Sequence, residues 1–225
     1  MSFNIVKIII DIMVLLFAVS IHEASHGYVA YKFGDPTPKV DGRLTLNPMA
    51  HLDLVGSIIV PAFLIIFKMP VFGWAKPVMI DPRNFDGDYN SVRKKMAAVA
   101  FAGPGSNFSV AILSAILLRI IFHFNPAVKL LIFTNTPMPS SLLAGIAFIL
   151  FELFIINVFL GLFNLIPIPP LDGGNILIGI LPPKAAIKYE KLQPYGFFIL
   201  LFLIYTGVYA FFIMPFFRLF LKLLG

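Results

Sequence analysis

The chain alternates long apolar stretches with short polar connections, a pattern typical of a protein that crosses a membrane several times. Four stretches are long enough to cross a bilayer as helices, and they lie at about residues 5–31, 96–122, 142–165 and 195–217. A fifth, at 52–67, has only about 16 residues. That length is short for a crossing and favours a re-entrant or tilted helix. We therefore predict an all-α polytopic membrane protein with four full transmembrane helices plus this short one.

Two polar connections also carry signals for extended structure. Asp41-Gly42 lies between short alternating runs, which is typical of a β-hairpin over residues 40–46. Residues 71–80 are flanked by Pro70 and Pro82 and look extended. We expect these segments to form a small membrane-associated β element.

Composition supports the membrane assignment. The 225 residues are 59% hydrophobic and 12% charged, so we expect one membrane domain over residues 1–225 and no separate soluble module. Cysteine is absent, which excludes disulfides and Cys-ligated zinc. The net charge of +6 would suit nucleic-acid binding. Lysines and arginines at cytoplasmic helix ends explain the charge better, so no nucleic-acid partner is expected.

The same basic residues predict orientation. Most of them lie in residues 32–43, 83–95 and 184–191. If the short apolar stretch does not cross, all three segments fall on one side, which should be the cytoplasm. The first apolar stretch runs on without a persuasive cleavage site, so we interpret it as a retained helix and not as a signal peptide.

The sequence His22-Glu23-Ala24-Ser25-His26 ends the first apolar stretch with an H-E-x-x-H motif. On a helix, residues i and i+4 share a face, so His22 and His26 can ligate one metal ion. Glu23 lies beside them, where it can act as general base toward a water activated by the metal. Ionisable groups are costly at membrane depth, so this cluster predicts a catalytic zinc site.

A catalytic zinc ion usually has three protein ligands, so a third must come from elsewhere in the chain. Asp172 lies where prolines and glycines break the helix over residues 167–174, at the depth expected for the motif. Irregular backbone at that depth is tolerated where it lines a wet cavity. We choose Asp172 as third ligand, with His51 and Glu152 as reserves. A purely structural role for Asp172, as cap of a helix from Gly173, stays open.

Three motifs follow one another along the chain: H-E-x-x-H at 22–26, G-P-x-x-N at 103–107 and N-x-x-P-x-P-x-L-D-G at 164–173. Together they resemble the site-2 protease family of intramembrane zinc metalloproteases. The sequences N-P-x-x-H-L-D at 47–53 and G-W-A-K-P at 73–77 are similar to a compact bacterial-type branch. Many members of the family carry a PDZ domain, and we expect none in this chain.

The resemblance implies one zinc ion per chain, held by His22, His26 and Asp172, with Glu23 as general base. It also implies that Asn164 holds the substrate backbone. Two further alternatives stay open at residues that the motifs single out. Asn107 is either a substrate-binding residue or an interhelical hydrogen-bonding one, and Gly103-Pro104-Gly105 is either functional or a kink for close packing.

We therefore expect an intramembrane zinc metalloprotease of the cell membrane, with its site toward the cytoplasm. Its substrates would be single-span membrane proteins or remnant signal peptides, and an unwound substrate segment would add to an exposed strand edge. The alternatives are a membrane metal transporter and a non-catalytic protein that binds membrane helices. A single site without an internal repeat argues against the first, and an intact Glu23 against the second.

Overall fold

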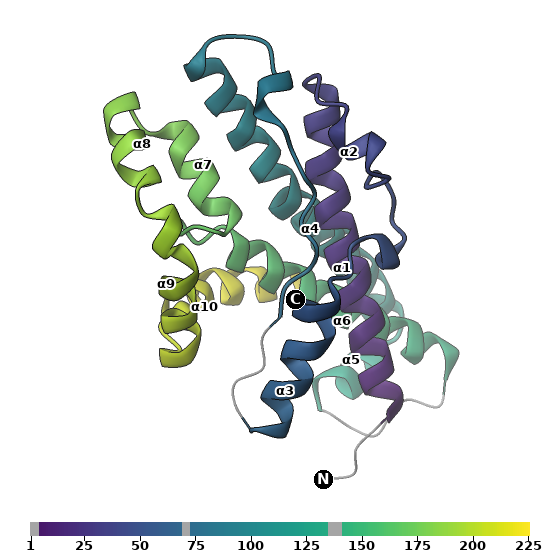
Figure 1. Ribbon diagram of the computed structural model, residues 1–225. Helices are drawn as coiled ribbons and strands as arrows, with labels where there is room; N and C mark the ends of the chain where they lie inside the picture. Colours follow the sequence, from purple (N-terminus) through teal and green to yellow (C-terminus); the bar gives the residue numbers. More distant parts are fainter. Residues whose placement is uncertain (1–4, 69–72, 135–140) are drawn as a thin grey trace.

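The computed structural model describes residues 5–68, 73–134 and 141–225 (Figure 1). Three helices are long and apolar enough to cross a membrane: α1 (Ile5–Lys32), α4 (Tyr89–Phe124) and α6 (Leu142–Asn164). The pair α9 (Gln193–Thr206) and α10 (Tyr209–Leu221) would make a fourth span only as a broken one, because its two parts are bent by 71°.

This bend interrupts the single span predicted for residues 195–217. Helix α9 ends at Gly207, which has a left-handed backbone with φ 72°. Glycine adopts that conformation without steric cost and commonly ends helices in this way. Helix α10 then turns across the middle of the molecule, where Ile213 packs with Ile166 and Leu171 of the loop between α6 and α7 (Figure 1).

The other helical elements are short and lie between the long helices. They are α2 (Thr37–Val40), η1 (Pro48–Ala50), η2 (Leu54–Ile59), α3 (Val60–Ile66), η3 (Pro82–Asn84), α5 (Pro126–Phe133), α7 (Asp172–Ile180), α8 (Pro183–Glu190) and η4 (Lys222–Leu224).

The predicted β element is wrong for the described residues, none of which forms a β-strand. The turn at Asp41-Gly42 exists, and Gly42 has a φ of 67°. It follows the helical turn α2, which begins at Thr37 directly after Pro36, and the Asp35 side chain accepts hydrogen bonds from the backbone N–H and the hydroxyl of Thr37. Residues 73–81 are extended but have no strand beside them, and residues 71 and 72 lie outside the described part.

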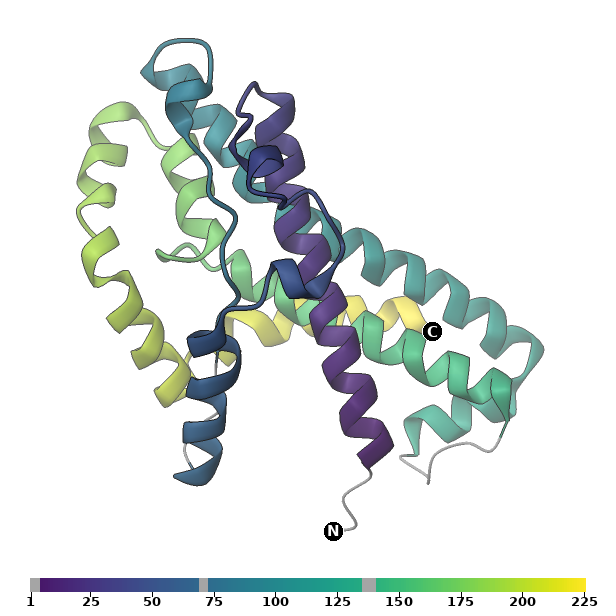
Figure 2. The same cartoon turned by 45° about the vertical axis from the view of Figure 1, so that its right-hand side comes forward.

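Helices α4 and α6 pack side by side, and α1 crosses them (Figure 2). Small side chains at this contact let the helices approach closely, which is how helices associate in a membrane. The buried core here contains Ala111, Ala115, Leu118 and Phe122 of α4 with Ala144, Ala147, Phe154 and Val158 of α6.

Two acidic residues of the apolar stretches are paired with one lysine. The Lys7 ammonium lies 3.1 Å from Asp11 and 2.8 Å from Glu152, so it joins α1 to α6. Pairing offsets the cost of placing charges at membrane depth.

The short apolar stretch descends through η2 and α3, and the extended segment 73–81 returns beside it (Figure 1). The N–H of Trp74 donates to the carbonyl of Gly56 at 3.2 Å, and the N–H of Lys76 donates to that of His51 at 2.9 Å. The indole of Trp74 occupies the space that a Cβ at Gly56 would need. Residues 73–81 thus run back toward the end of the molecule at which η2 begins.

Asp35 anchors the far end of this returning segment. Its side chain is fully buried just beyond α1. It accepts hydrogen bonds from the N–H of Asp81 at 2.8 Å and from the amide of Asn84 at 2.8 Å, besides those from Thr37. Burial alone would raise the pKa of Asp35, but the hydrogen bonds from Thr37, Asp81 and Asn84 outweigh it and hold the pKa below its ordinary value of 3.8.

We predict that Asp35→Ala lowers the free energy of unfolding by roughly 1.5–3 kcal/mol, because several buried donors lose a charged acceptor. An acid whose pKa is lower in the folded state stabilises the fold fully when the pH lies above its pKa in the unfolded chain. This stabilisation is lost as the pH falls through the pKa of the folded state. Thermal unfolding of wild type and variant in detergent should therefore differ most at about pH 7, and the difference should shrink only as the pH falls below 3.8 toward the lower pKa of the folded state. A difference independent of pH would contradict this account.

Candidate metal centre

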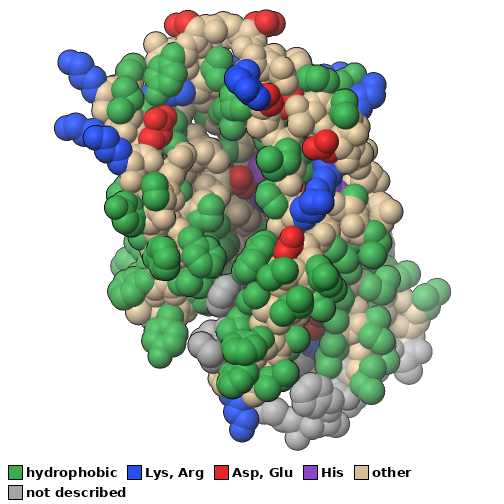
Figure 3. Space-filling view, viewed as in Figure 1, with side chains coloured by type: hydrophobic (Ala, Val, Ile, Leu, Met, Phe, Trp, Pro, Cys, Tyr) green, Lys and Arg blue, Asp and Glu red, His purple; other side chains and the backbone are tan. Residues whose placement is uncertain are grey.

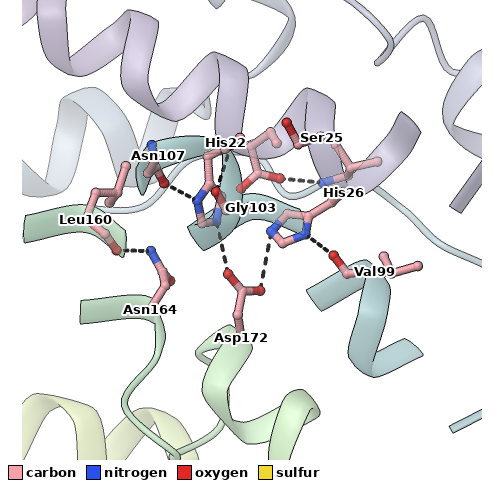
Figure 4. Close-up of polar contacts among 12 residues, drawn as sticks. His22, Ser25, His26, Val99, Gly103, Asn107, Leu160, Asn164 and Asp172 are labelled. Atoms are coloured by element: carbon pink, nitrogen blue, oxygen red, sulfur yellow. Dashed lines mark hydrogen bonds and ion pairs between the residues drawn. The ribbon is translucent and has the colours of Figure 1, made fainter. Parts of the chain in front are cut away.

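The H-E-x-x-H motif lies on one continuous helix, α1, and its two histidines face the same way. Both imidazoles are buried, with ring centroids 4.6 Å apart. Glu23 lies between them in sequence and is half-buried. As the i, i+4 spacing predicts, one ring nitrogen of each histidine points to the same side, toward Asp172 (Figure 4).

The hydrogen-bond network defines which nitrogen of His22 carries its proton. The Asn107 amide donates to the carbonyl of Ala18 at 3.1 Å and to Oδ1 of Asn157 at 2.8 Å. Its own Oδ1 is therefore an acceptor, and it lies 2.6 Å from Nδ1 of His22. Nδ1 must donate, so the lone pair of His22 is on Nε2.

His26 is held in the same tautomer by backbone. Its Nδ1 lies 2.7 Å from the carbonyl oxygen of Val99 on α4, which can only accept. The lone pair of His26 is therefore also on Nε2. Helix α4 thus orients both histidines of α1 through the ring nitrogens that face away from the centre.

Asp172 completes the group from a third element. It is the first residue of α7, where a carboxylate interacts favourably with the helix dipole. Its oxygens lie 3.0 Å from Nε2 of His22 and 3.3 Å from Nε2 of His26. The following Gly173 packs against the loop before α7, where a Cβ would lie 2.6 Å from the carbonyl carbon of Leu165.

The donor set fits a zinc ion. Ligand atoms of His22, His26 and Asp172 lie within 4.8 Å of one another. All three offer lone pairs, and Oδ2 of Asp172 is buried without a hydrogen-bond partner among the described residues. Converging buried acceptors repel one another unless a cation lies among them, and two imidazoles with a carboxylate are a usual zinc set with an open fourth position.

Gly103 gives the site its room. A Cβ at this position of α4 would lie 2.5 Å from Cε1 of His26 and 2.6 Å from Cε1 of His22. Only a residue without a side chain lets α4 approach α1 so closely. The G-P-G sequence thus does more than allow a kink, because it leaves the space that the two imidazoles occupy.

Glu23 points to the returning segment. Its Oε2 accepts a hydrogen bond of 3.0 Å from the backbone N–H of Val78. The extended segment therefore passes directly beside the motif.

The remaining predicted residues lie as follows. Asn164 ends α6 near Asp172 and His22, and its amide donates to the carbonyl of Leu160 at 3.0 Å (Figure 4). His51 is buried elsewhere, with Nε2 2.9 Å from the carbonyl oxygen of Thr45. Neither reserve ligand, His51 nor Glu152, belongs to the metal-binding group found among the described residues.

The face of the molecule is hollowed beside this centre. Figure 3 shows the hollow between the part built from α7, α8 and α9 and the part built from α1, α3 and residues 73–81, with acidic and histidine atoms visible inside. Trp74 and Phe197 come from the two sides and meet edge to face, with centroids 6.4 Å apart. The hollow is therefore open on this face and is bridged by the contact between these two rings.

A helical membrane protein with a His-His-Asp metal group beside a glutamate belongs to the class of membrane-embedded metalloproteins. Residues 10–206 match the model of Peptidase family M50, so the chain is a member of this family of zinc metalloproteases, the site-2 proteases. No solved structure gives a significant match to the chain.

Three relatives illustrate the likeness. "Putative zinc metalloprotease YwhC" of Bacillus subtilis is 34% identical over 91% of this chain and 84% of its own length. "Putative zinc metalloprotease Rip2" of Mycolicibacterium smegmatis is 27% identical over 85% of this chain and 64% of its own length. The Rip2 protein of Mycobacterium tuberculosis is 28% identical over 84% and 62%. The chain thus spans less than two thirds of these mycobacterial relatives.

Two contributors were not found by sequence reasoning. Asn157 of α6 supports Asn107, and an asparagine in an apolar span is itself a signal because unpaired amides are costly there. The second is the backbone carbonyl of Val99, and nothing in the side chain of that residue indicates that its carbonyl holds His26.

We predict that Gly103→Ala prevents zinc binding while the protein remains folded, since the new methyl group displaces both imidazoles. Gly105→Ala is the matched control, because its Cβ would meet only the side chain of Phe101 at an ordinary 3.4 Å or more. Metal content after purification in detergent, with helicity by circular dichroism, measures both effects. Full zinc content in Gly103→Ala would refute the packing argument.

We predict that Asn107→Ala weakens zinc binding by roughly 10–100-fold, because His22 loses the partner that sets its tautomer and orientation. Asn157→Ala removes a neighbouring amide but keeps the Asn107–His22 contact, and should weaken binding less. Titration against a competing chelator gives both affinities. Equal losses would mean that the network, and not the contact to His22, matters.

Proposed function

We propose that this protein hydrolyses peptide bonds within or near transmembrane segments, with Glu23 as general base and His22, His26 and Asp172 as zinc ligands. The observation that carries the proposal is the convergence of two buried imidazoles and the half-buried carboxylate of Asp172 beside a glutamate in a helix long and apolar enough to cross a membrane. The chemistry that zinc supplies when bound is Lewis-acid activation of water and of the peptide carbonyl.

The residues of the chain supply the proton transfers. Glu23 takes a proton from the attacking water and returns it to the leaving amine, so that the peptide C–N bond breaks and Glu23 is again a carboxylate at the end. Asn107 and the carbonyl of Val99 keep the histidines in the ligating tautomer throughout. We also propose that Asn164, at the end of α6, holds the substrate backbone through its side-chain amide.

The substrates that fit best are single-span membrane proteins or remnant signal peptides. A transmembrane helix uses all its peptide groups internally, so it must unwind before a bond can be cut. The extended segment 73–81 offers an edge for the unwound chain. The N–H groups of Trp74, Lys76 and Val78 donate toward the protein. Alternate residues of an extended chain face opposite ways, so the N–H groups of Ala75 and Met79 point outward. These two N–H groups have no hydrogen-bond partner within the described residues.

We propose a multi-pass location in the cell membrane with the centre toward the cytoplasmic side. The end of α1, the start of α4 and α8 lie at the same end of the molecule (Figures 1 and 2). These are the elements around which the basic segments 32–43, 83–95 and 184–191 are found, and positive residues gather over α8 (Figure 3). The descent through η2 and α3 and the return of residues 73–81 toward the same end support a re-entrant element, which would keep all three segments on the cytoplasmic side.

The test is cleavage of a model single-span substrate by purified wild type and Glu23→Gln in detergent, with zinc measured in both. We expect cleavage by wild type alone and equal zinc content, because glutamine is isosteric but cannot take the proton. Chelation should abolish cleavage and added zinc restore it. Cleavage by Glu23→Gln would remove Glu23 from the proposed role, and absence of zinc from both proteins would refute the centre.

A further inference from the structure

The contact between Val78 and Glu23 links two parts of the protein that are far apart in the sequence. The Val78 N–H donates to Oε2 of Glu23 at 3.0 Å. It is the only hydrogen bond to this carboxylate among the described residues, so it alone holds one of the two oxygens in place. The other oxygen, Oε1, remains for a water molecule.

The amide of Val78 is itself firmly placed. On one side, Lys76 is bonded to the carbonyl of His51, and on the other, Asp81 is bonded to the buried Asp35. The Val78 side chain is buried against α1, where a Cβ at Gly27 would lie 3.3 Å from its Cγ1. The N–H therefore has a defined position relative to the helix that carries Glu23.

We propose that the backbone N–H of Val78 is a positioning group for Glu23, and that it couples the extended segment to the base. This inference rests on the proposed function. A carboxylate held through one oxygen is already restricted in orientation, so less entropy is lost when the reaction begins. Misplacing a reacting group by about 1 Å can reduce the rate on the order of 100-fold.

The coupling follows from the geometry of an extended chain. Val78 turns its N–H toward Glu23, while its neighbour Met79 turns its N–H the other way. A substrate segment that pairs with the outer edge therefore tightens the same backbone that holds the base on the inner side. Pro77, directly before Val78, has no N–H, so the outer edge has a gap there.

Two proline variants one residue apart separate the inner edge from the outer one. Val78→Pro removes the donor to Glu23, and we expect kcat to fall by roughly 10–100-fold with little change in KM and full zinc content. Met79→Pro removes an outward donor, and we expect KM to rise with kcat nearly kept. Val78→Ala keeps the N–H and loses only side-chain packing, so its kcat should fall far less than that of Val78→Pro.

A double-mutant cycle tests whether the effect passes through Glu23. Aspartate at position 23 is too short to reach the Val78 N–H, so Val78→Pro should add little to the loss already caused by Glu23→Asp. Additive losses of kcat in this cycle would overturn the proposal. A smaller rise of KM in Met79→Pro than in Val78→Pro would also overturn it.

Amide hydrogen exchange of residues 73–81 provides a readout that needs no activity. We expect faster exchange at Val78 in Glu23→Ala, where the acceptor is gone, but not in Glu23→Gln, where an amide oxygen replaces it. Unchanged exchange in Glu23→Ala would refute the contact. If wild type fails to cleave yet Glu23→Ala accelerates exchange, the proposed function has failed while the Val78–Glu23 contact stands.

Discussion

Two buried imidazoles and a half-buried carboxylate, with lone pairs directed at one another, are the constraint on which the architecture depends. His22, His26 and Asp172 come from two helices, and a cation among them relieves their mutual repulsion. To hold them there, the protein ties each histidine by its other nitrogen, one to Asn107 and one to a carbonyl of α4. Helix α4 can do this only because Gly103 leaves space for both rings.

The carboxylate imposes a second requirement, which is irregular backbone at membrane depth. Asp172 can reach the histidines because α6 ends at Asn164 and a loop of prolines precedes α7. Unpaired backbone groups in lipid cost several kcal/mol each, so such a loop must be covered by protein. Helices α9 and α10 lie against it, with Gly196 next to Pro169 and Ile213 next to Leu171. The bend at Gly207 lets one apolar stretch cover two sides of this loop.

The opposite wall of the hollow is built differently. Residues 54–66 enter as a short helix and residues 73–81 return as extended chain, and hydrogen bonds to Gly56, His51, Glu23 and Asp35 hold the return. An isolated extended chain would be unstable, so these bonds take the place of a neighbouring strand. Metal ligands thus stand on regular helices, while the surface proposed for the peptide is a single extended segment beside the base.

Sequence by itself determined the features that depend on local spacing and composition. The i, i+4 histidines, the apolar lengths of α1, α4 and α6, and the family motifs are all properties of neighbouring residues. Other features depend on contacts between distant residues. The pattern in 40–46 was misleading because Val40 ends the helical turn α2 and residues 41–46 continue as turn and irregular chain without a strand, and the predicted span 195–217 is broken at Gly207. The Val78–Glu23 bond and the space at Gly103 were decided by tertiary structure alone, because a backbone amide and a missing side chain acquire meaning only from what packs against them.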